Sequence, residues 1–140
     1  MLIDEIKKAN IEALKAKDPI ARGVLSVVIN KYKLQEVELK ANGKEIGDKE
    51  LLAVIQKTLK ELADEKEGYL KVNNQDRAND IARQEELLSG YLPKQLSEQE
   101  IRNIIASLED KSVPNVMKHF KMNYAGQVDM SLVNSVLRSL

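Results

Sequence analysis

Apolar residues recur at intervals of three and four positions through nearly the whole of this 140-residue chain. That spacing places them along one face of an α-helix. Residues 24–29 form an apolar run that by itself would suit a buried strand, but no second strand-like segment exists to pair with it. The pattern therefore predicts an all-α protein.

Proline, glycine and capping residues divide this pattern into separate helices. Pro19 suits the first turn of a helix but not its interior, and Asp18 before it can cap that helix by accepting bonds from its exposed amides. Ser97 and Glu100 have the spacing of a capping box, and Asp48 and Asp129 are predicted N-caps. Helices are predicted over residues of about 2–17, about 20 residues from Pro19, 48–71, 75–89, 98–110, 114–126 and from 129 to the end.

The chain is predicted to form two helical domains that divide at Leu92-Pro93. The residue before a proline is pushed out of the helical region, so Leu92 should stand between helices. Residues 1–92 then form an N-terminal domain of long helices. Residues 93–140 form a short C-terminal three-helix bundle.

Several classes of active site are excluded by residue content. The chain has no cysteine, which rules out disulfides, thiolate metal sites and a cysteine nucleophile. His119 is the single histidine, so a two-histidine metal site is impossible. It lies on a predicted helix with no acid three or four residues away. No phosphate-binding glycine motif and no nucleophile elbow occurs. We therefore expect a protein without catalytic activity, cofactor or metal.

The chain also carries no signal for a membrane or for export. Its N-terminus leads directly into mixed charge, unlike a signal peptide. No apolar run approaches the roughly 18–20 residues that span a bilayer. We expect a cytoplasmic protein.

Charge is balanced overall but uneven along the chain. Twenty-two basic residues face twenty-two acidic ones, which argues against binding nucleic acid through bulk potential. From residue 111 onward, four basic side chains face one acidic side chain. Cations next to amides and aromatics are typical of an RNA backbone footprint. The candidate nucleic-acid-binding residues are Lys111, Lys118, His119, Lys121, Gln127, Asn134 and Arg138.

Two other interpretations of this cluster stay open. A helical protein with this many basic residues acquires such clusters by chance, and they then serve only to solvate its surface. Alternatively, the chain is a protein-interaction module whose C-terminal bundle docks a partner helix in an apolar groove.

Residues 91–101, which read YLPKQLSEQEI, resemble the YLPxQLSxxEI junction of the GatB/YqeY family. Residues 116–118 and 126–129 are similar to that family's MGKVM and GRxD segments. Residues 131–137 resemble its helix-forming tail, and residues 13–18 with Arg22 resemble its opening. The resemblance spans the whole chain.

The resemblance implies a long-helix domain followed by a three-helix bundle, with tRNA or a tRNA-modifying or aminoacylation enzyme as partner. The larger relative is the B subunit of the tRNA-dependent amidotransferase, whose corresponding tail holds tRNA. Its carbon–nitrogen ligase activity, with glutamine as amide donor, belongs to an upstream domain that has no counterpart here. The chain departs from the family pattern at Pro114, Asn115 and Gln127, where the family has glycine, lysine and arginine.

Overall fold

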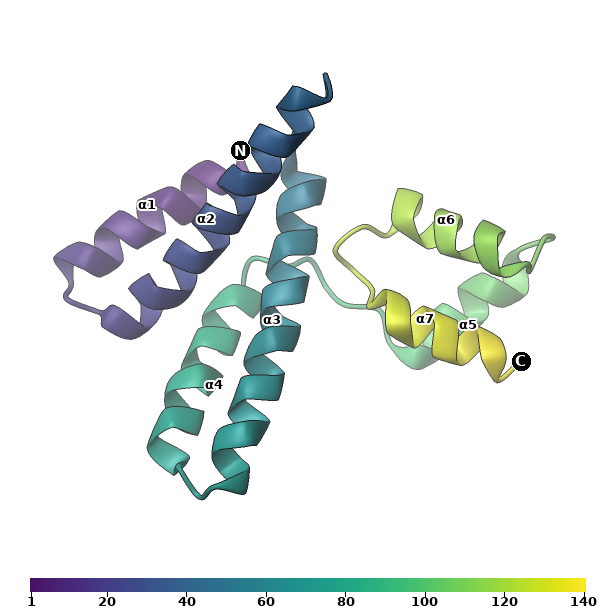
Figure 1. The fold of residues 1–140 in the computed structure, drawn as a ribbon. Helices are drawn as coiled ribbons and strands as arrows, with labels where there is room; N and C mark the ends of the chain where they lie inside the picture. Colours follow the sequence, from purple (N-terminus) through teal and green to yellow (C-terminus); the bar gives the residue numbers. More distant parts are fainter. The chain divides into compact units, whose positions relative to one another are not determined.

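The computed structural model describes residues 1–140 and contains seven helices and no strand, which confirms the predicted all-α fold (Figure 1). The chain divides into two compact units, Met1–Tyr91 and Leu92–Leu140. The helices are α1 (Leu2–Lys15), α2 (Pro19–Ala41), α3 (Asp48–Lys71), α4 (Gln75–Ser89), α5 (Glu98–Ser107), α6 (Val113–Asn123) and α7 (Met130–Arg138). None of them combines the length and the apolar character that a membrane span requires.

The first unit consists of two helical hairpins. In Figure 1, α1 lies beside α2 and α3 lies beside α4, and α2 also packs on both α3 and α4. Residues 24–29, which also suited a strand, lie within α2, as predicted. Apolar side chains from all four helices fill the core. Those fully buried include Ile6, Leu25, Val28, Leu51, Ile55 and Leu88. Leu14 and Ala63 are exposed, although the helical spacing of the apolar residues predicts that they face inward.

The start of α3 differs from the prediction. Gly47, and not Asp48, is its N-cap, and the Gly47 amide donates to Glu50 Oε2 over 2.8 Å. Asp48 is the first helical residue, and its Oδ1 accepts from the Leu2 amide over 3.3 Å. Glu50 reaches back to the amide that precedes the helix, and the acid at position 48 bonds α1 instead.

The second unit is built around Phe120, which is fully buried. Its core is completed by Ile101, Ile105, Val116, Val128, Val133 and Val136. The predicted capping box is present, because Ser97 Oγ accepts from the Glu100 amide and Glu100 Oε1 accepts from the Ser97 amide. Asp129 caps α7 by accepting from the Ser131 amide over 2.9 Å. Local capping signals therefore define the starts of α5 and α7.

Two helix ends of the second unit were predicted too late. α5 ends at Ser107 and not near residue 110, because Leu108 adopts extended backbone angles. α6 ends at Asn123 and not at Gly126. Gly126 instead turns the following loop with a φ of 77°, a conformation that glycine adopts without strain.

Candidate nucleic-acid interface

Lys118 and Lys121 lie on the exposed side of α6. Their spacing of three residues places them one turn apart, while Val116 and Phe120 mark the buried side of the same helix. Arg138 is exposed in the last turn of α7. None of these three cations takes part in an ion pair. They are the predicted residues best placed to meet a phosphate.

Lys111 serves the turn between α5 and α6. Its Nζ donates to the Leu108 carbonyl over 2.7 Å, at the end of α5 where helix carbonyls lack partners. Asp110 Oδ1 accepts from the Ser112 amide over 2.9 Å, and this bond lowers the pKa of Asp110. Asn115 Nδ2 donates to the Asp110 carbonyl over 2.6 Å. Lys111 and Asn115 therefore both stabilise the turn between α5 and α6.

His119 is surrounded by neutral neighbours. Its ring meets the Phe120 ring edge-on and the Tyr124 ring at a tilt, each with centroids 6.0 Å apart. Asn123 Nδ2 donates to the His119 carbonyl over 3.0 Å and lies 3.3 Å from Nδ1 of the ring. This places His119, Asn123 and Tyr124 together in an amide–aromatic cluster at the C-terminal end of α6.

Gln127 and Asn134 are half-buried. The main chain of Gln127 is fully engaged, since its amide donates to the Tyr124 carbonyl over 3.0 Å and its carbonyl accepts from the Leu96 amide over 2.7 Å. Asn134 lies in the middle of α7. The predicted residues therefore come from α6, α7 and the loops at their ends, and α6 holds three of the seven.

The junction residues that resemble the family motif have a structural role that the sequence reading did not assign. Gln95 Nε2 donates to the Gly126 carbonyl over 2.6 Å and to the Pro93 carbonyl over 2.9 Å. The Leu96 amide bonds the Gln127 carbonyl next to it. These bonds fasten the start of the second unit to the loop between α6 and α7. The partners lie 31 residues apart in sequence, so no local pattern could reveal the contact.

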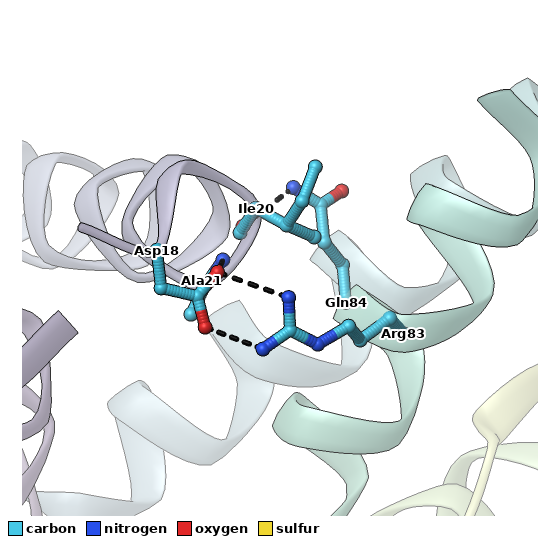
Figure 2. Close-up of polar contacts among 5 residues, drawn as sticks. All are labelled: Asp18, Ile20, Ala21, Arg83 and Gln84. Carbon is cyan, nitrogen blue, oxygen red and sulfur yellow. Dashed lines mark hydrogen bonds and ion pairs between the residues drawn. The ribbon is translucent and has the colours of Figure 1, made fainter. Parts of the chain in front are cut away.

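A second polar cluster, in the first unit, was also missed (Figure 2). The Arg83 guanidinium of α4 donates hydrogen bonds to both carboxylate oxygens of Asp18, from Nη1 to Oδ1 over 3.0 Å and from Nη2 to Oδ2. Hydrogen bonds from Arg83 and from the Ala21 amide hold the pKa of Asp18 below its usual value. Gln84 Nε2 donates to the Ile20 carbonyl over 2.9 Å. Asp18 was predicted as a cap of α2, and it also fixes α2 to α4.

Two shallow hollows border Asp18. One, of about 530 Å³, is lined by residues of α1, α2 and the loop between them, including Leu14, Lys17 and Arg22. The other, of about 460 Å³, lies between the start of α2 and α4 and includes Arg83 and Gln84. Because the charge of Arg83 is matched by Asp18, the second hollow offers little to an anion.

The model of the YqeY-like protein family matches residues 3–140 of the chain. No curated protein matches it.

Proposed function

The chain belongs to the YqeY-like protein family, and from that premise we propose that it is a non-catalytic helical module that binds tRNA through its second unit. The observation that supports this proposal is that three cations of the second unit are exposed and unpaired. Lys118, Lys121 and Arg138 are exposed and outside ion pairs, and α6, which carries both lysines, also carries the amide–aromatic cluster. Cations of this kind meet phosphates, whereas amides and aromatics meet sugars and bases.

Several cations of the first unit already have acidic partners. Lys31 and Lys66 each pair with an acid on another helix, at 2.8 Å for Lys31–Glu61 and 2.6 Å for Lys66–Glu85, and Arg83 pairs with Asp18, the N-cap of α2. A lysine already paired with a carboxylate must give up that partner to bind a phosphate. Lys118, Lys121 and Arg138 carry no such cost, and they follow residue 110, where four basic side chains stand against one acidic side chain, so we place the proposed footprint there.

The departures from the family pattern set the expected strength of binding. Asn115 and Gln127 have neutral side chains, so neither position adds a cation. The Asn115 side chain bonds the Asp110 carbonyl, and the Gln127 main chain bonds Leu96. Two or three phosphate contacts remain. The slope of log affinity against log salt should therefore be about −1.4 to −2.7, at roughly 0.7–0.9 for each phosphate. Such binding is weak and suits an accessory role in tRNA metabolism or beside a tRNA-dependent amidotransferase.

The test is a filter-binding titration of the full chain against tRNA across a range of salt concentrations. Lys118→Ala with Lys121→Ala should weaken binding at low salt and reduce the slope by about 1.4–1.8. The matched control is Lys7→Ala with Lys8→Ala, which removes two exposed lysines from α1 in the first unit and should change neither quantity.

Three results would count against the proposal. The first is a wild type that binds no tRNA at low salt. The second is an equal loss of binding in both double variants, which would indicate that total charge and not this surface matters. The third is binding that does not respond to salt, which an apolar docking groove would give.

A further inference from the structure

Helix α2 carries apolar side chains on two opposite faces. One face points into the core of the first unit, where Val28 and Tyr32 are buried. On the other face, Val27, Leu34 and Val37 are 43%, 73% and 69% exposed. A surface helix ordinarily shows a polar face to water. The outer stripe of α2 therefore has no role in the fold of its own unit.

The outer stripe has the spacing of a coiled-coil seam. Its positions are separated by three, four, three and four residues, which makes them alternating a and d sites of a heptad. The seam consists of Val27, Asn30, Leu34, Val37 and Ala41. In this register Leu25, Tyr32 and Leu39 occupy f sites, the side opposite the seam, and they are buried or half-buried in the core. The core and the seam thus divide the helix between them.

The free part of the seam begins at Val27. Closer to the start of α2, Gly23 lies against α4, because a Cβ atom there would come within 3.5 Å of Gln84 Nε2. Beyond Val27, α2 extends past α1, its neighbour in the hairpin, because α2 has 23 residues and α1 has 14 (Figure 1). The seam covers two heptads, or about 21 Å of helix.

We propose that this seam is the interface at which a second copy of the chain binds, with the two α2 helices parallel and in register. The flanking charges favour this occupant. Lys33 at a g site and Glu38 at the following e site are exposed and outside ion pairs. A parallel pair places Lys33 of each copy beside Glu38 of the other, twice by symmetry. Lys31, at the other e site, is neutralised within its own unit by Glu61.

Other occupants fit the seam less well. An antiparallel pair would set g sites against g sites and bring lysines together. An RNA backbone requires cations, which the seam positions themselves lack. Two heptads are short for a coiled coil, so we expect a weak dimer with a dissociation constant in the micromolar range.

Sedimentation velocity on the full chain over a wide concentration range tests the interface. Leu34→Glu puts a charge in the middle of the seam and should weaken the dimer at least about tenfold. Circular dichroism should stay unchanged, because Leu34 contributes nothing to the core. The control is Met122→Glu, which alters a side chain of similar exposure, 67%, in the second unit. It should leave the dimer intact.

The register is tested by cross-linking, for which a chain without cysteine is well suited. In a parallel pair, Val27→Cys brings two thiols within disulfide reach at adjacent a sites. In an antiparallel pair centred on the seam, the same two thiols lie about 21 Å apart. Lys33→Glu should also weaken the dimer, and adding Glu38→Lys to it should restore the affinity.

Four results would overturn the proposal. They are a wild type that stays monomeric at every concentration, a dimer indifferent to Leu34→Glu, a Val27→Cys variant that does not cross-link, and a seam occupied by a different protein in place of a second copy.

Discussion

The two units of this chain keep their helices together by different means. The helices of the first unit run from 14 to 24 residues, and three ion pairs join separate helices along their length. The helices of the second unit have 9 to 11 residues. There the helices are joined by a small apolar core around Phe120 and by a side-chain amide that bonds a loop carbonyl.

This difference determines what each unit can spare for function. Long helices bury enough apolar area to tolerate a second stripe on α2, and three cations of this unit hold its helices together. The short helices leave Lys118, Lys121 and Arg138 without a structural partner. We therefore expect losses in the second unit to concentrate at a few residues, and losses in the first to be small and distributed.

The largest effect should follow Phe120→Ala. Removing a fully buried phenyl ring costs about 3–5 kcal/mol, which is comparable to the whole stability of so small a unit. Residues 92–140 should then unfold while the first unit stays folded. Limited proteolysis followed by mass spectrometry would show cleavage confined to the second unit. Met122→Ala, at an exposed position of the same helix, should change nothing. Loss of both units together would show that they fold as one body.

Gln95→Ala should have the next largest effect. It leaves the carbonyl of the buried Gly126 without its side-chain donor, at a cost of about 1–2 kcal/mol to the second unit. Urea unfolding measures this loss. Gln99→Ala breaks an amide contact of similar length on the exposed face of α5 and should cost less than about 0.5 kcal/mol. Equal costs would show that the junction does not fasten the loop.

A smaller and pH-dependent loss should follow Asp18→Asn in the first unit. The pKa of Asp18 is lowered in the folded state, first by its bond to Arg83. The stabilisation is therefore present above the unfolded pKa, near 4, and is lost as the pH falls through the lower folded value. Thermal melts should separate wild type from variant at pH 7 and bring them together in strong acid. Asp64→Asn, at an exposed position of α3, should show no such convergence. A difference in melting temperature between wild type and Asp18→Asn that stays the same at all pH values would contradict the ion pair.

The contacts that carry these predictions differ in how far the sequence could reveal them. The caps Asp18, Ser97 and Asp129 were predictable because each bonds an amide two or three residues away. The Asp18–Arg83 pair spans 65 residues, so only the packing of α2 on α4 creates it. No feature of the neighbouring sequence distinguishes an arginine that forms such a pair from one that points into water.

The predicted interface shows the same limit. Lys118 and Lys121 are exposed and Phe120 is buried, a division that helical spacing makes readable from the sequence because it fixes both sides of α6 at once. Lys111 was grouped with them by charge alone. Its bond to Leu108 follows from the early end of α5, which the sequence placed about three residues later. The outer stripe of α2 was overlooked because the inner stripe already accounted for the helix.

The smallest effect is also the sharpest test of how the two units use their cations. Lys66→Met keeps the aliphatic stem and the helix propensity but removes the charge that lies 2.6 Å from Glu85 Oε1. Both side chains are largely shielded, at 33% and 21% exposure, so the loss should reach up to about 1 kcal/mol. Lys118→Met makes the same change at a lysine without a partner and should shift stability by less than about 0.5 kcal/mol. Added salt should reduce the difference in unfolding free energy between the two variants. Screening weakens the Lys66–Glu85 pair in the wild type, and only the Lys66 variant has lost that pair. Chemical unfolding at two salt concentrations measures both effects. If the Lys118 variant is the less stable one, its charge serves the fold, and the surface proposed for tRNA loses its main support.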